Sequence, residues 1–232
     1  MPNKILAIGA HPDDVEFGCA PLLIKEVKKG HQVKILALSL GEAGSSGSPE
    51  GRKQEAMEGA KIIGAEIEFL DLGGDCHIEY KPENGIAIAR KIRENKPNIV
   101  LAPDLSENQH PDHAAAGKIA RDAARFARYG GLAELKNLPV HKIDSLYFYT
   151  ITQFFGSQPD ILIDVTEVYP QWEKAMQAHQ SQMKSKKYLE LISSWSKALG
   201  SAIGVEHAVG IKTNEPIQLD NLSDITLSSR NY

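Results

Sequence analysis

Two short stretches of this chain carry the residue types that bind metals and transfer protons. The first reads Ala10-His11-Pro12-Asp13-Asp14, and the second, about a hundred positions later, reads His110-Pro111-Asp112-His113. Side chains three positions apart on a tight turn or in a helix can face one point. If the fold brings the two stretches together, His11, Asp14 and His113 are candidate ligands of one divalent metal, with the carboxylate of Asp13 beside it.

The residues around these ligands indicate what the metal would do. Two imidazoles and one carboxylate with an open position form the usual plan of a catalytic zinc site, and the same set suits a non-haem Fe(II) triad. Asp13 is placed to take a proton from an attacking water, and His110 to stabilise or protonate the tetrahedral species. Asp112 can hold one histidine in its tautomer. These groups favour hydrolysis, because no motif points to the co-substrate site of an oxygenase.

The element before the first stretch is an apolar run, residues 4–8, without polar alternation. Such a run is typical of a strand that is buried on both faces. Residues 19–30 follow with helical apolar spacing and end at a glycine. The first stretch therefore lies on a strand-to-helix turn, at the sheet edge where open α/β sheets bind ligands. Its turn does not read G-x-G-x-x-G, and its acids stand where a pyrophosphate would bind, so a dinucleotide site is excluded.

Strand and helix signals alternate along the rest of the chain, which predicts a parallel sheet with crossover helices. Further strands are expected at residues 33–40, 66–70, 99–102, 145–150, 161–165 and about 207–212. Further helices are expected at residues 50–64, 82–96, 111–128, 170–183 and 186–199. No linker or repeat divides the chain, so we expect one domain over residues 1–232. In the common doubly wound order 3-2-1-4-5, strands one and four are neighbours, and the two stretches meet in one crevice.

Composition and charge exclude several other classes of protein. The 232 residues are 42% hydrophobic and 24% charged, as in ordinary globular proteins. A formal charge of −4 and a pI near 6.1 argue against nucleic-acid binding. The sequence shows neither a membrane span nor a signal peptide, and Cys19 and Cys76 form no CxxC motif. We therefore expect a cytoplasmic protein with reduced thiols, and no nucleic-acid or membrane partner.

The two stretches together resemble the PIG-L/LmbE family of zinc-dependent de-N-acetylases, and the likeness covers nearly the whole chain. Gly51-Arg52 with Glu55 is similar to the arginine-and-glutamate segment of the family. Residues 179–182 and 204–208 are similar to late segments of the bacillithiol-pathway branch, the N-acetylglucosaminyl malate deacetylases. The resemblance implies a Rossmann-like fold and hydrolysis of an N-acetyl group on a glucosamine-containing small molecule.

The resemblance also implies a role for each site residue. His11, Asp14 and His113 would bind Zn²⁺, Asp13 would be the general base, and His110 the acid and electrostatic partner, with Asp112 behind the histidines. Arg52 would bind substrate, and the chain would form a homo-oligomer, a hexamer or a trimer.

One position departs from the bacillithiol branch. That branch usually carries an arginine where this chain has Gln109, a candidate substrate-binding residue. Glutamine lacks the charge and the bidentate fork that would pair with the malate carboxylate. The alternatives to the malate conjugate are N-acetylglucosamine or chitooligosaccharides as substrates, and a metal-dependent sugar-binding protein without catalysis.

Overall fold

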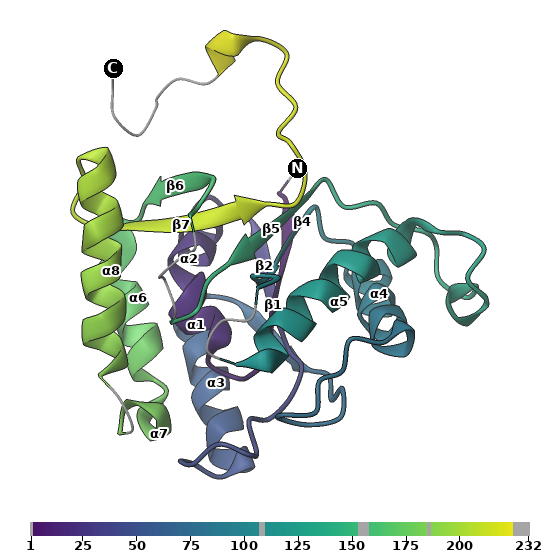
Figure 1. Cartoon of the computed structure of the whole chain (residues 1–232), viewed down its shortest axis with the longest axis horizontal. Helices are drawn as coiled ribbons and strands as arrows, with labels where there is room; N and C mark the ends of the chain where they lie inside the picture. The colour runs from purple at the N-terminus through teal and green to yellow at the C-terminus, as the bar shows by residue number, and fades with distance from the viewer. Residues whose placement is uncertain (1, 107–109, 153–157, 185–186, 225–232) are drawn as a thin grey trace.

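The computed structural model describes residues 2–106, 110–152, 158–184 and 187–224. In this part of the chain, seven strands form one sheet in the order β3-β2-β1-β4-β5-β7-β6 (Figure 1). The strands are β1 Lys4–Gly9, β2 Gln32–Ala37, β3 Glu66–Phe69, β4 Ile99–Pro103, β5 Ser145–Tyr149, β6 Ile161–Asp164 and β7 Ala208–Thr213. Strands β3, β2, β1, β4 and β5 are parallel, and β7 pairs antiparallel with β5 and β6. The predicted mostly parallel α/β sheet is confirmed.

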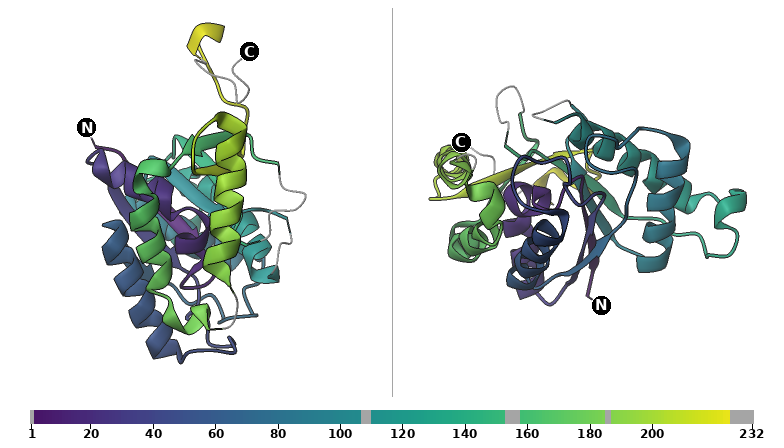
Figure 2. Two further views of the ribbon diagram at one scale, coloured as in Figure 1. Left: turned by 90° about the vertical axis from the view of Figure 1, so that its left-hand side faces the viewer. Right: turned by 90° about the horizontal axis from the view of Figure 1, so that it is seen from below.

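Helices cover both faces of the sheet. They are α1 Asp14–Gly18, α2 Ala20–Lys28, α3 Pro49–Ile63, α4 Pro82–Asn95, α5 Pro111–Arg128, α6 Tyr169–Gln177, α7 Gln180–Met183 and α8 Tyr188–Ile203. Helices α4 and α5 lie on one face, and α1, α2, α3, α6 and α8 lie on the other (Figures 1 and 2). Among the described residues, none of the helices combines the length and apolarity that a membrane crossing requires.

Strand β1 shows why a continuous apolar run is needed at the centre of this sheet. Ile5 and Ala7 pack into the core beneath α2, α3 and α6, whereas Leu6 and Ile8 pack into the core beneath α4 and α5. Alternate side chains of a strand point to opposite faces, so both sets are buried. The burial on both faces that the sequence predicts is therefore present.

Two predicted helices differ from those in the structure. The helix expected at residues 170–183 is broken into α6 and α7 at His179, whose ψ of 61° is not helical, and Glu55 accepts hydrogen bonds from both the N–H and the hydroxyl of Ser181 in the first turn of α7. The helix expected at residues 19–30 is α2, but a separate short helix, α1, precedes it. The two meet where Gly18 packs against the ring of Tyr149, which a β-carbon would approach to 2.3 Å.

The arrangement of β1 and β4 positions the site. These strands pair in parallel with Ile5 opposite Ile99 and Ala7 opposite Leu101, so their carboxyl ends lie side by side. The hydroxyl of Tyr149 on β5 donates a 2.7 Å hydrogen bond to the carbonyl of Ile8, which ties the end of β1 to the next strand but one. The two stretches singled out in the sequence both begin at this edge.

Candidate active site

The three predicted metal ligands converge beyond the ends of β1 and β4. His11 Nδ1 lies 3.2 Å from His113 Nε2 and 3.5 Å from Asp14 Oδ1. Asp14 Oδ1 lies 3.1 Å from His113 Nε2, and all three side chains are buried. The fold thus brings together residues that are about a hundred positions apart in the chain.

These distances agree with the geometry of a four-coordinate metal. Zinc bonds of about 2.0–2.1 Å at tetrahedral angles separate ligand atoms by about 3.3 Å. The second oxygen of Asp14 accepts a 2.9 Å hydrogen bond from the backbone N–H of His11, which leaves Oδ1 facing the two rings. Two imidazole nitrogens and a carboxylate oxygen therefore present lone pairs to one point, and this donor set fits zinc.

Helix α5 supplies the second stretch. His110 is its N-cap residue, and Pro111 occupies the first turn, where its missing N–H leaves no bond unmade. Asp112 and His113 follow in the same turn and are buried. The acidic side chain of Asp112 suits a helix N-terminus, because the first backbone N–H groups carry a partial positive charge there.

Two carboxylates determine which nitrogen of His11 carries a proton. His11 Nε2 lies 3.0 Å from Asp75 Oδ1 and 3.3 Å from Asp112 Oδ2, so Nε2 donates to them, and Nδ1 is the nitrogen that would bind a metal after losing its proton. Burial alone lowers the pKa of His11, but the charge of Asp14 and hydrogen bonds to the carboxylates outweigh it and raise that pKa well above 6.5. The hydrogen bond with His11 lowers the pKa of Asp75 to about 2.

Sequence reasoning missed Asp75. The residue follows two glycines with positive φ, in the loop after β3. Its N–H donates a 2.9 Å hydrogen bond to Glu42, and the N–H of Cys76 donates one of 2.8 Å to Asp112. The available signal was an acidic residue in a glycine-rich loop at the same sheet edge as the two stretches.

The predicted general base, Asp13, is held by Arg52. Arg52 Nη2 donates a 3.0 Å hydrogen bond to Asp13 Oδ1, and Nη1 donates one of 2.7 Å to the carbonyl of Gly41. Both side chains border the cleft, and the guanidinium is buried. Arg52 therefore fixes the direction of the Asp13 carboxylate, and its predicted role in binding substrate stays a prediction.

His110 is prepared to donate a hydrogen bond from its ring. Its Nδ1 accepts the N–H of Asp112 at 3.2 Å, so in the neutral ring Nε2 carries the proton. Burial and the charge of His11 lower the pKa of His110, which keeps the ring neutral near pH 7. Gln109, the predicted substrate-binding neighbour, lies outside the described residues.

An open cleft surrounds these groups. The described residues lining it include Phe17, Ala43–Ser45, Ile151, Thr152, Gln182 and Tyr188. The loop at residues 41–49 therefore lies at the rim of the cleft. Gln182 on α7 donates a 3.0 Å hydrogen bond to the carbonyl of Ser46 and fastens this loop to the body of the protein.

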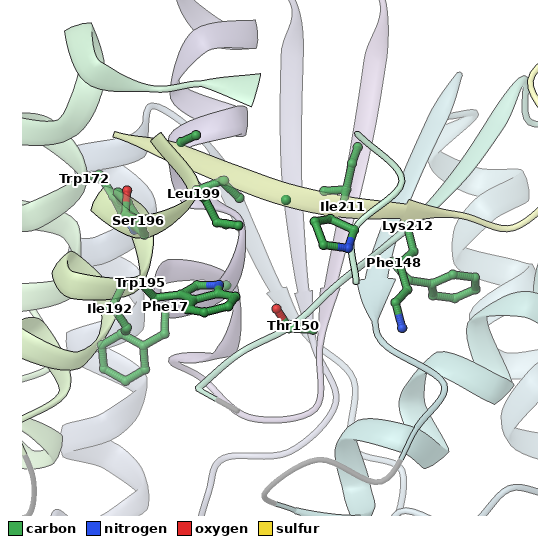
Figure 3. Close-up of a pocket in the computed structure, with 15 residues that line it drawn as sticks. Phe17, Phe148, Thr150, Trp172, Ile192, Trp195, Ser196, Leu199, Ile211 and Lys212 are labelled. Carbon is green, nitrogen blue, oxygen red and sulfur yellow. The ribbon is translucent and has the colours of Figure 1, made fainter. Parts of the chain in front are cut away.

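A second pocket lies behind Phe17, between α8 and the sheet. Trp195 and Leu199 extend into it from α8, and Thr150 faces it from the end of β5 (Figure 3). Among the described residues that line it there is no histidine, cysteine or acidic side chain. The pocket is lined mainly by apolar side chains, and its described residues offer no set of metal ligands.

The family described as PIG-L, GlcNAc-PI de-N-acetylase, matches residues 6–124 of this chain, which contain both stretches. The chain therefore belongs to the PIG-L family. Together with the relatives below, this membership identifies it as an N-deacetylase.

Two curated relatives and one solved structure illustrate the likeness. The diacetylchitobiose deacetylase of Thermococcus kodakarensis is 30% identical over 90% of this chain and 82% of its own length. The 4-oxalmesaconate hydratase of Pseudomonas putida is 23% identical over 96% of this chain and 93% of its own length. The crystal structure of the conserved protein TT1542 from Thermus thermophilus superposes with a TM-score of 0.85 at 28% identity, covering 95% of this chain and 98% of that one.

Proposed function

We propose that this protein is a zinc-dependent hydrolase that removes the acetyl group from an N-acetylglucosamine-containing small molecule. The observation that supports this most is the convergence of His11, Asp14 and His113, with Asp13 and His110 beside them. When held by the three ligands, zinc would acidify water and polarise the amide carbonyl.

The residues of the chain account for the proton transfers that hydrolysis requires. Asp13, held by Arg52, accepts the proton of the attacking water as its oxygen bonds to the carbonyl carbon. The Nε2–H of His110 donates a hydrogen bond to the oxyanion that develops. When the carbon–nitrogen bond breaks, the leaving amine takes up the proton that Asp13 accepted from the water, and acetate and the free amino sugar remain.

The cleft favours a neutral sugar partner over malate. Among the described residues that line it, Arg52 is the sole lysine or arginine, and its guanidinium already binds Asp13 and the Gly41 carbonyl. A malate conjugate would bring two carboxylates that need cationic or N–H partners. The Thermococcus relative is named for diacetylchitobiose, so we propose a short N-acetylglucosamine oligomer as the substrate. A hexameric or trimeric assembly, a single domain and a cytoplasmic location stay predictions.

The proposal is tested by acetate release from diacetylchitobiose, N-acetylglucosamine and N-acetylglucosaminyl malate. Each is assayed before chelation, after chelation and after zinc is returned. We expect zinc-dependent release from diacetylchitobiose to exceed release from the malate conjugate. Acetate release from the malate conjugate alone would support the reaction but refute the proposed substrate. No release from any of the three compounds would refute the hydrolase and favour the alternative of a sugar-binding protein.

The variant Asp13→Asn tests whether Asp13 acts as the general base or as a zinc ligand. We expect the variant to keep one zinc per chain, measured by atomic absorption, and to lose nearly all turnover. Glu58→Gln is the matched control, because Glu58 is an exposed acid that pairs only with a surface lysine among the ion pairs found. Loss of zinc from Asp13→Asn would make Asp13 a ligand and overturn its assignment as the base.

A further inference from the structure

A second group of metal-binding atoms lies on the Nε2 side of the His11 ring, away from the three proposed ligands. Cys76 Sγ is 3.6 Å from Asp75 Oδ1 and 3.5 Å from His110 Nε2. Asp75 Oδ1 and His110 Nε2 are 3.8 Å apart. None of these three side chains belongs to the first group of ligands.

The three distances suit one four-coordinate cation. With zinc–sulfur bonds of about 2.3 Å and zinc–nitrogen or zinc–oxygen bonds of about 2.0–2.1 Å, sulfur lies about 3.5 Å from the other ligand atoms, and nitrogen about 3.3 Å from oxygen. Both observed distances from the sulfur fit this pattern, and the distance between nitrogen and oxygen needs only a small inward rotation. Thiolate, imidazole and carboxylate together select zinc and softer thiophilic cations.

Solvent reaches this group, and the chemistry of His110 makes it the weaker of the two. Cys76 is exposed and the His110 side chain is 29% exposed, so a cation can arrive without displacing structure. Binding through His110 Nε2 moves the ring proton to Nδ1, which breaks the hydrogen bond from the N–H of Asp112. The thiol proton is released to the buffer at the same time. A metal at the three buried ligands also displaces a proton, that of His11 Nδ1, but it leaves the backbone hydrogen bond to Asp14 intact, so these ligands fill first.

We propose that Asp75, Cys76 and His110 form a second site for a thiophilic divalent cation, Zn²⁺ or Cd²⁺, and that its occupation inhibits the enzyme. A cation there takes the lone pair of His110 Nε2 and removes the N–H that the proposed reaction uses to stabilise the oxyanion. The binding step stands on the geometry alone, whereas the inhibition rests on the proposed function of His110.

The test begins with protein that holds one equivalent of zinc and adds further zinc or cadmium. We expect a second equivalent to protect Cys76 from a disulfide reagent that modifies exposed thiols, and cadmium to produce the ultraviolet absorption of a metal thiolate. Cys76→Ser should lose the absorption and the second equivalent. Cys19→Ala is the matched control: it removes the other thiol, which is buried, and should behave as the wild type.

Acetate release is measured in the same titrations. Activity of the wild type and of Cys19→Ala should fall at least tenfold as the second site fills, relative to each protein at one equivalent. Cys76→Ser should keep its activity over the same range. Equal inhibition of wild type and Cys76→Ser would overturn the proposal. So would a Cys76 thiol that reacts as fast with two equivalents of metal as with one. Thiol protection without inhibition would confirm the second metal site and overturn the inhibition through His110. Absence of acetate release at all zinc levels would refute only the proposed function.

Discussion

Asp75 offers the sharpest test of how the metal centre is held, because no local motif marks it and its role follows from one contact. Its Oδ1 lies 3.0 Å from His11 Nε2, and its side chain is 6% exposed. Asp75→Asn keeps the size and an acceptor oxygen but removes the charge, and Asp75→Ala removes both. If Asp75 orients His11 for the metal, both variants weaken zinc binding, and Asp75→Ala weakens it more than Asp75→Asn.

The size of the effect follows from the pKa of Asp75. Its fall from 3.8 to about 2, to which the hydrogen bond with His11 contributes most, corresponds to about 60-fold in an equilibrium constant. Asp75→Ala should therefore weaken zinc binding by up to about 60-fold. A charge-assisted hydrogen bond is about twice as strong as a neutral one, so Asp75→Asn should cost about half as much energy, roughly eightfold in affinity.

The affinity is measured by competition against a chromophoric zinc chelator, at subequivalent metal so that only the stronger site fills. Glu79→Gln is the matched control, since Glu79 is an acid of the same connection whose side chain is 71% exposed. Unchanged zinc affinity in Asp75→Ala would refute the assignment, and so would a larger loss in Asp75→Asn than in Asp75→Ala.

Three further predictions concern pH, the Arg52 ion pair and a close backbone contact. Because the pKa of His11 is raised in the fold, its protonation stabilises the metal-free protein fully below about pH 6.5, and this stabilisation is lost as pH rises through the raised pKa. The gain in Tm on adding zinc should therefore grow with pH. A gain in Tm that shrinks with pH would contradict this. Arg52→Gln should lower the free energy of unfolding in urea by about 3 kcal/mol, because it leaves the Asp13 carboxylate without its partner. The double variant with Asp13→Asn should lose less than the sum of the two single variants, because neither charge is then left unpaired. Gly117→Ala should cost about 1–3 kcal/mol, since its β-carbon would lie 2.3 Å from a carbonyl of β4, whereas Gly131→Ala, with open space, should stay within about 0.5 kcal/mol.

The parts of the fold that the sequence predicted well are those with a strong local period. Strand β1 is apolar at every core position, and α5 carries a proline at its start and a regular apolar face, so both lie where the pattern placed them. Helices α6 and α7 were predicted as one because apolar spacing continues through the break. The break falls at His179, and the start of α7 is held by the contact of Ser181 with Glu55, which is distant in sequence, so no local signal reports it.

The residues of the candidate site were likewise predictable only where a local pattern marked them. The convergence of His11, Asp14 and His113 was predictable, because each stretch has its own three-residue spacing and the strand order places β1 beside β4. Asp75 was not, since a loop without period has no predictable direction. Its position depends on left-handed backbone and on hydrogen bonds to Glu42 and from Cys76 to Asp112, all of them tertiary.

The two nitrogens of His11 explain why this loop matters to the chemistry. Nδ1 faces Asp14 and His113, and Nε2 faces Asp75 and Asp112, so one ring joins the proposed metal ligands to the loop after β3. Any change that turns Asp75 away alters the basicity of a proposed metal ligand, and a cation held by Asp75, Cys76 and His110 would bind the same carboxylate. The same loop therefore connects the assembly of the first metal site with the proposed inhibition at the second.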